Sequence, residues 1–294
     1  MRWLCAMILL AAGSAAADPK LVVGIYAPNA PFESGDARYS FASRLGQQIQ
    51  AATGVGTEPR AFARAADFEA AIAKQQIDFA IVDGVYLAER NVPYAVIASA
   101  TSGGETATRW SLFSSLPGGI FELAGKRIAL AATGPKDTQF IDNALLDGEL
   151  LHHFGARETA PDINSAVTAV VLKKADCVFA PDLSGRGLRR VFDAGHVPNP
   201  AFVQVRSTVA AEVVEKVKKA VLAASGGASY DGWKAGGADA LRSFGARMGA
   251  KLRRPVMAEP AVVPVAAADA LVATPLEPTT LDLRDQFWNP TGAP

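Results

Sequence analysis

The stretch GKRIALAATGPKDTQFIDNALLDGELL (Gly125–Leu151) has the pattern of a buried strand, a polar turn and a helix. Its first part, KRIALAA, is a short apolar run, and its last part repeats apolar residues at helical spacing. The turn between them, Ala131–Thr138, should place unpaired backbone N–H groups and hydroxyls at a helix start. This order predicts one unit of an α/β fold and raises the question of what the turn holds.

The same alternation of strands and helices fills most of the chain. In the first half, Gly54 and Asp67 are a natural helix end and a plausible helix N-cap. Strands are expected at 21–27, 57–62, 77–83 and 94–100, and helices at 39–53 and 67–76. Because helices between strands make the strands run parallel, this half predicts a mostly parallel sheet flanked by helices.

The pattern restarts at Arg109. Strands are expected at 109–115, 126–132, 175–181 and 202–205, and helices at 138–153, 162–174, 208–224 and 233–244. Two segments, Ala71–Asp83 and Ala169–Asp182, share a helix, a basic or amide turn, and an apolar strand that ends in Asp. The sequence therefore predicts two lobes of one design.

The composition excludes several classes of function. The 294 residues are 50% hydrophobic and 20% charged, as in ordinary globular proteins, and Lys+Arg and Asp+Glu balance at 29 each. That balance provides no basic field for nucleic acid. Three histidines and two cysteines are too few to indicate a metal site, and no cofactor is expected. Cys177 lies in an apolar run and is expected to be a buried, inert thiol.

The N-terminus has the pattern of a secretory signal peptide. Met1-Arg2 precedes an apolar run, Trp3–Ala12, that is too short to span a bilayer, and Ser14–Ala17 supplies small residues for cleavage. Residues 1–17 are therefore expected to be removed, the alternative being a short retained anchor. Cys5 is not at the cleavage point, so no lipid anchor is expected, and a periplasmic location fits best.

The last forty residues differ from the rest of the chain. Residues 255–294 are rich in Pro, Ala and Val, and are expected to form a tail along the surface or to stay mobile. The tail ends in LDLRDQFWNP, whose Leu281, Leu283, Phe287 and Trp288 could pack on their own domain or bind another protein.

Four segments together resemble a known family: Ile77–Glu89 (IDFAIVDGVYLAE), Thr108–Ser115 (TRWSLFSS), Leu123–Leu146 and Lys174–Asp182 (KADCVFAPD). Their order resembles that of the type II periplasmic substrate-binding proteins of ABC transporters, most of all the phosphate- and phosphonate-binding branch. The resemblance covers about Leu21–Phe244 and rests on the order of elements. It implies a two-lobed type II periplasmic-binding-protein fold, in which each lobe is a mostly parallel sheet flanked by helices.

The resemblance also implies a domain organisation. Lobe 1 would comprise residues 18–105 plus 206–254, and lobe 2 residues 106–205. Two strands would cross between the lobes, near Thr106–Trp110 and Gln204–Ser207. A ligand would be caught between the lobes by hinge closure, which couples binding to a change of shape.

Ligands of open α/β sheets bind at the carboxyl ends of the strands, beside helix starts. In lobe 2 that position belongs to the turn of Thr133, Gly134 and Thr138, where N–H groups, hydroxyls and a helix dipole favour phosphate, phosphonate or carboxylate. The turn departs from the family pattern in having fewer hydroxyls, and Pro135 lacks an N–H. The alternative is that Thr138 or Asp137 is only a helix cap.

The candidate ligand-binding residues of lobe 1 also follow strand ends. They are Gly84 and Tyr86 after the strand at 77–83, and Tyr26 and Asn29 after the first strand. Arg109, near the first crossing, could pair with an anion. For Tyr86 the alternative is simple packing, and for Arg109 it is an exposed or structural ion pair.

No motif for a catalytic nucleophile, a nucleotide loop or a metalloprotease occurs, and no nucleophile–base pair can be nominated. The chain is therefore expected to be a monomeric binding protein that captures a small oxyanion for an ABC permease. The alternative is an accessory or sensor-partner protein on the same fold, and an enzyme is the least favoured.

Overall fold

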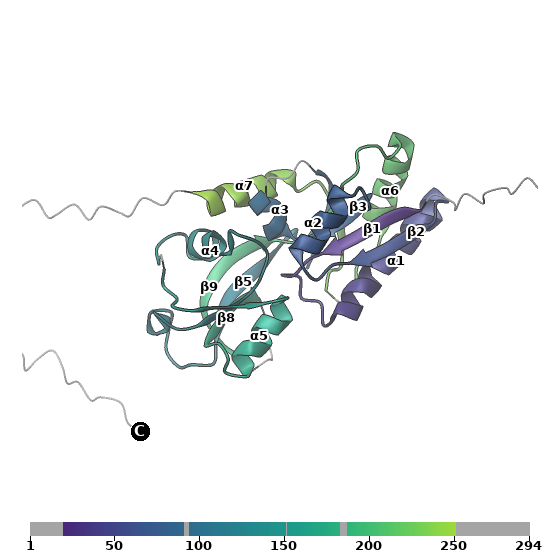
Figure 1. The fold of residues 1–294 in the computed structure, drawn as a ribbon. Helices are drawn as coiled ribbons and strands as arrows, with labels where there is room; N and C mark the ends of the chain where they lie inside the picture. Colours follow the sequence, from purple (N-terminus) through teal and green to yellow (C-terminus); the bar gives the residue numbers. More distant parts are fainter. Residues whose placement is uncertain (1–19, 91–93, 151, 183–186, 228, 251–294) are drawn as a thin grey trace, which may run out of the picture. The chain divides into compact units, whose positions relative to one another are not determined.

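The computed structural model describes residues 20–90, 94–150, 152–182, 187–227 and 229–250. The expected signal peptide and the tail at 255–294 lie outside the described residues. Two separate β-sheets organise the described residues, each with its own helices (Figure 1). The predicted two-lobed α/β fold is confirmed.

The first sheet has six strands in the order β11-β4-β10-β3-β1-β2. β1 runs parallel to β2 and β3, whereas β10 is antiparallel to β3 and β4, and β11 is antiparallel to β4. Their bounds are β1 Leu21–Tyr26, β2 Thr57–Ala61, β3 Phe79–Val82, β4 Ala95–Thr101, β10 Ala201–Gln204 and β11 Gly232–Ala235.

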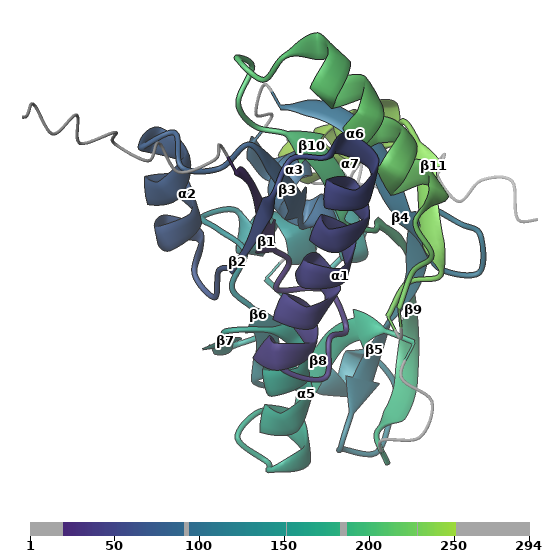
Figure 2. The same ribbon diagram turned by 90° about the vertical axis from the view of Figure 1, so that its right-hand side faces the viewer.

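Both faces of this sheet are buried, because successive side chains of a strand point to opposite faces. In β1, Val23 and Ile25 pack in the core under α1 (Gly35–Thr53) and α6 (Ala211–Ala223), which contact each other (Figure 2). Tyr26 lies in the other core, with residues of α2 (Ala65–Ala73) and α3 (Gly84–Arg90). The strand predictions for this lobe follow from these buried runs.

Capping explains where the first helices begin and end. α1 begins after Ser34, whose hydroxyl accepts from the Ala37 N–H, and it ends at Gly54 with φ 75°, as predicted. The prediction that Asp67 caps the second helix is wrong. Arg64 occupies the cap position of α2 without a side-chain cap, and Asp67 pairs with that arginine at 2.7 Å.

The second sheet has five strands in the order β7-β6-β8-β5-β9. β6 runs parallel to β7 and β8, and β5 is antiparallel to β8 and β9. Both sheets are thus mixed rather than mostly parallel, because the crossing strands β5 and β10 run against their neighbours. The bounds are β5 Ala107–Ser114, β6 Ile128–Ala131, β7 Arg157–Ala160, β8 Cys177–Pro181 and β9 Arg189–Pro198.

The helix expected at 138–153 is shorter and less regular. A single turn, α4 (Asp137–Gln139), continues into a π-helical segment, η2 (Phe140–Leu145), and Asp147 and Gly148 with positive φ follow it. A short 3-10 turn, η1 (Phe121–Leu123), precedes β6. The helix expected at 162–174 is confirmed as α5 (Ile163–Val171), with Asp162 as its N-cap.

The helix expected at 233–244 is also corrected. Residues 232–235 form β11, and α7 (Ala238–Gly249) begins only after Gly236 and Gly237, whose positive φ breaks the chain direction. Leu241 of α7 lies in the core of the first lobe, whereas Phe244 and Met248 lie in the core of the second. The last helix therefore packs against both lobes.

The second crossing comes earlier than expected. Residues 201–204 pair with β3 and β4, so they belong to the first sheet rather than to lobe 2. The two crossings are joined by the Asn199 N–H, which donates to the Thr106 carbonyl at 2.9 Å. Cys177 is buried as predicted, and burial raises the pKa of its thiol to about 12.

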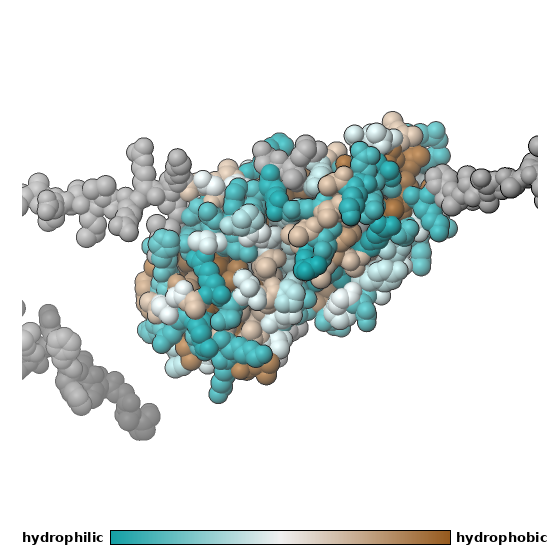
Figure 3. All heavy atoms as spheres, in the orientation of Figure 1, coloured by the Kyte–Doolittle hydropathy of each residue, from teal (hydrophilic) through white to brown (hydrophobic). Residues whose placement is uncertain are grey.

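The surface shows no single dominant apolar area on the face in Figure 3, where hydrophilic residues are interspersed with smaller apolar ones. The large exposed hydrophobic residues of the described chain are Tyr39, Phe121, Val171 and Leu172. None of the described helices is long and apolar enough to cross a membrane.

Candidate functional site

The strand ends of the two lobes meet at Tyr26. Its side chain is 1% exposed, and its hydroxyl lies 3.3 Å from the carbonyl oxygens of Ala132 and Thr133 at the end of β6. The ring packs against Phe68 and Tyr86 in the core of lobe 1. Tyr26 thus links the first strand of lobe 1 directly to the predicted anion-binding turn of lobe 2.

That turn, residues 133–137, is called the cradle turn below. Three of its donors converge on one oxygen, Oδ1 of Asp137: the Thr133 N–H at 3.2 Å, the Thr133 hydroxyl at 2.7 Å and the Gly134 N–H at 3.2 Å. The turn therefore has the geometry of an oxyanion site, and the chain's own carboxylate occupies it. Burial raises the pKa of Asp137, against the lowering effect of these hydrogen bonds.

A second carboxylate closes the same turn from lobe 1. Oε1 of Glu89, at the end of α3, accepts from the Lys136 N–H at 3.1 Å. The other oxygen, Oε2, is buried without a hydrogen-bond partner and lies against Gly134. Glu89 is only 5% exposed, and this burial raises the pKa of its carboxyl group. Every N–H that the cradle turn can offer between 133 and 136 is thereby satisfied internally, since Pro135 has none.

The strand end of lobe 1 is occupied in the same way. The buried carboxylate of Asp83 accepts from the backbone N–H groups of Asn29 and Val85, both at 2.9 Å, and from the Asn29 side chain at 3.3 Å. Burial raises the pKa of Asp83. Asn29, predicted to contact a ligand, is therefore turned toward an internal acceptor.

Gly84 and Tyr86 serve packing in this arrangement. A Cβ at Gly84 would overlap the carbonyl oxygen of Pro198, so glycine allows the second crossing to lie against the start of α3. The Tyr86 hydroxyl points to α2, where it donates to Oε1 of Glu69 at 3.1 Å. Burial raises the pKa of this phenol.

Thr138 directly follows the cradle turn, but neither its hydroxyl nor the Arg109 side chain forms a described hydrogen bond with the residues of that turn. The Thr138 hydroxyl accepts a hydrogen bond from Arg157 of β7. The Arg109 side chain is 52% exposed and pairs with Asp193 on the neighbouring strand β9. This pairing holds the pKa of Asp193 down at about 2. Of the predicted set, the structure thus brings Tyr26, Thr133 and Gly134 together at the cradle turn, while Tyr86 contacts Tyr26 only through its ring.

The lobes also meet along α1 and α5. Arg38 of α1, 6% exposed, forms an ion pair with Asp162 at 3.4 Å, and the Ile163 N–H donates to the Pro28 carbonyl at 2.9 Å. The Asn164 side chain donates to the Phe32 carbonyl. Sequence reasoning missed Arg38 and Asp162, because nothing in their local patterns shows that they face each other across two lobes.

The space near the strand ends is small. A cavity lined by Asn29, Asp83, Trp110, Asn199 and Tyr230 has a volume of about 20 Å³. Such a volume holds roughly one water molecule. Among the described residues, no cluster of three or more His, Cys, Asp or Glu side chains could hold a metal ion.

Together, the two mixed sheets, the paired crossings and the strand-end turns define the fold of a type II periplasmic binding protein. No family model matches the sequence, and no curated protein matches it. Known proteins resemble this chain in their three-dimensional structure.

Three solved structures illustrate this likeness. The binding protein component of an ABC phosphonate transporter from Pseudomonas aeruginosa has a TM-score of 0.60 at 14% identity, over 79% of this chain and 88% of its own. PhnD1 from Prochlorococcus marinus, in complex with methylphosphonate, has 0.61 at 10% identity, over 76% and 94%. A Xanthomonas citri protein bound to ATP has 0.57 at 12% identity, over 78% and 96%.

Proposed function

We propose that the protein is an exported periplasmic binding protein that captures a small solute with an oxyanion group, such as phosphate or a phosphonate, for an ABC transporter. The observation that carries this proposal is the convergence of three donors on Asp137 Oδ1 at the end of β6. An oxygen of an external anion in that position would receive the same three hydrogen bonds. The apolar run at the N-terminus, followed by small residues at Ser14–Ala17 that suit signal-peptide cleavage, supports export.

In this proposal Asp137 is the internal competitor of the ligand. Two anions at one site repel each other, so Asp137 has to leave the cradle turn before an external oxyanion can bind there. Glu89 and Tyr26 have to move with the opening of the lobes, because both contact the turn from lobe 1. Ligand binding would then be coupled to hinge motion.

The fold supports a binding function but does not select the ligand. The P. aeruginosa and P. marinus proteins belong to phosphonate uptake or bind methylphosphonate, and identities of 14% and 10% carry over the fold alone. The choice of an oxyanion therefore rests on the donors of the cradle turn. No catalytic role is proposed for any residue.

A second candidate function is an accessory or sensor-partner protein that binds another protein and no small solute. The observation that favours it is the filled space at the strand ends, where the cavity is only about 20 Å³ and both turns hold internal carboxylates. In that case Asp83 and Asp137 would be permanent parts of the fold.

A thermal-shift screen of the mature chain from Asp18 separates the two candidates. Its panel holds phosphate, methylphosphonate, aminoalkylphosphonates, sulfate, carboxylates and amino acids. A solute at 100 times its dissociation constant stabilises the fold by about 2.7 kcal/mol. We expect a shift with a phosphorus oxyanion that is lost in Thr133→Val and kept in Ser111→Ala, a buried hydroxyl outside the turn. No shift with any solute would refute solute capture and favour the accessory function.

A further inference from the structure

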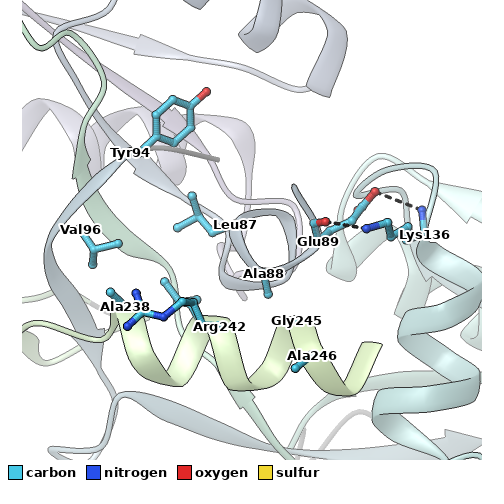
Figure 4. Close-up of a pocket in the computed structure, with 11 residues that line it drawn as sticks. Leu87, Ala88, Glu89, Tyr94, Val96, Lys136, Ala238, Arg242, Gly245 and Ala246 are labelled. Carbon is cyan, nitrogen blue, oxygen red and sulfur yellow. Dashed lines mark hydrogen bonds between the residues drawn. The ribbon is translucent and has the colours of Figure 1, made fainter. Parts of the chain in front are cut away.

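A cleft of about 430 Å³ lies between α3, β4 and α7 (Figure 4). Leu87, Val96 and Leu241 give it apolar walls, and Ala238 and Ala246 line it from α7. Its volume lies within the range of roughly 300–1,000 Å³ that is typical of small-molecule sites. It is more than ten times larger than the cavity at the strand ends, of about 20 Å³.

Two cationic side chains line this cleft. Among the described residues, the Lys136 ammonium donates one hydrogen bond, to the Glu89 carbonyl at 2.8 Å, so these residues leave two of its three donors open. The Arg242 guanidinium pairs with Asp239, whose side chain is 91% exposed. An ion pair that exposed contributes little and is readily exchanged. Figure 4 shows Arg242 near Ala238, and Lys136 beside Glu89.

The acidic and polar neighbours do not cancel these cations. Glu89 lines the cleft, but its carboxylate is turned to the Lys136 N–H, and its second oxygen is buried. Tyr94 is half-buried, and burial raises the pKa of its phenol, so it remains a neutral hydrogen-bond donor. The open donors of the cleft therefore favour an anion, and Leu87, Val96 and Leu241 supply apolar contact within a lining that is more polar than apolar.

We propose that this cleft is a second ligand site that binds a small carboxylate with an apolar body, such as a medium-chain fatty acid or an aromatic acid. The planar guanidinium of Arg242 matches a carboxylate with two parallel hydrogen bonds. The apolar body contacts Leu87, Val96 and Leu241, which line the cleft. The cleft shares Lys136 with the cradle turn and Glu89 with the carboxylate that closes this turn, but octanoate binding to the chain without any phosphorus oxyanion tests the cleft by itself.

Isothermal titration of octanoate into the mature chain tests the proposal. We expect saturable binding that Arg242→Gln weakens at least tenfold. Arg247→Gln is the matched control, because Arg247 lies on the same helix, stacks on Phe244 and does not line the cleft. Ala246→Leu fills the cleft from an exposed helix position and should abolish binding without unfolding the chain.

Two control ligands complete the test: octanol, which is neutral, and octylamine, which is cationic. Octanol and octylamine should bind much more weakly than octanoate, since neither pairs with Arg242. The proposal is overturned if octanoate fails to bind, if Arg242→Gln and Arg247→Gln weaken it equally, or if octylamine binds as tightly. Each of these outcomes can be read without any result on phosphate or phosphonate binding.

Discussion

At the scale of single residues, three acidic side chains decide the state of the strand ends. Asp83 and Asp137 each accept the hydrogen-bond donors of a turn at a strand end, and Glu89 accepts from the remaining N–H of the cradle turn. The sequence predicts the turns from their position after apolar strands. It does not predict their occupants, because which carboxylate reaches which N–H depends on the folded backbone. In the sequence, the only sign that the turn holds an internal carboxylate is Asp137, which follows Thr133-Gly134 at the start of the helix.

Gly84 tests the close approach of the second crossing. Gly84→Ala places a Cβ against the Pro198 carbonyl, where backbone leaves no room. We expect a loss of about 1–3 kcal/mol in the free energy of unfolding, as for other overpacked sites. Urea denaturation measures it. Gly35→Ala, at an open position in the first turn of α1, is the control and should be neutral. Equal effects would refute the packing role.

Glu89 predicts a pH dependence of stability. Because burial raises its pKa in the folded state, the folded chain retains this proton to higher pH than the unfolded chain. Its contribution to stability is thus full below about pH 4.3, the ordinary value for Glu, and is lost as pH rises through the folded-state pKa. In Glu89→Gln, the fall in the free energy of unfolding between pH 4 and pH 7 should be smaller than in the wild type.

The exposed Glu149→Gln is the control for that measurement. Its pH profile should follow the wild type. An unchanged profile in Glu89→Gln would contradict the assignment of a raised pKa to this buried carboxyl.

At the scale of elements, the strands could be predicted far better than the helix ends. Apolar runs such as 77–83 and 175–181 became buried strands, since both faces of their sheets are covered. The prediction of a regular helix at 138–153 was wrong, because the spacing of apolar residues reveals neither a π-helical segment nor the positive φ of Asp147. The segment 232–235 became a strand because β4 offers it a free edge.

The last helix should stabilise both lobes. Phe244→Ala removes a buried ring that packs against Phe140 in the core of lobe 2. We expect a loss of about 3–5 kcal/mol in the free energy of unfolding, as for other buried phenylalanines. Ser243→Ala, at an exposed position of α7, should change it little. A loss below about 1 kcal/mol in Phe244→Ala would contradict a core role for α7.

At the scale of the whole chain, the sequence predicted two α/β lobes but not how their residues meet. Tyr26, Arg38 and Glu89 of lobe 1 all contact lobe 2, over sequence separations of 47 to 124 residues. No local pattern reports contacts of such separation. If the protein captures a solute, these contacts between the lobes must open. In the accessory function, where Asp83 and Asp137 permanently fill the strand ends, they stay closed.

Hydrogen exchange can follow that opening. The Ile163 N–H donates to Pro28 across the lobes, beside the ion pair of Arg38 with Asp162. In Arg38→Gln we expect faster exchange at Ile163, because a neutral amide holds Asp162 less well. Arg44→Gln, an exposed position on the same helix, should leave the rate unchanged. Equal rates in all three chains would show that the ion pair does not hold the lobes together.

The most direct test of the central proposal compares methylphosphonate binding to the wild type and to Asp137→Ala by isothermal titration. If the cradle turn is an oxyanion site with an internal competitor, removing the carboxylate leaves three donors open and removes a like charge. The affinity should then rise at least tenfold, which is about 1.4 kcal/mol of binding free energy. Adding Thr133→Val to Asp137→Ala should remove this gain. An unchanged or lower affinity in Asp137→Ala, or no binding to either chain, would contradict the account.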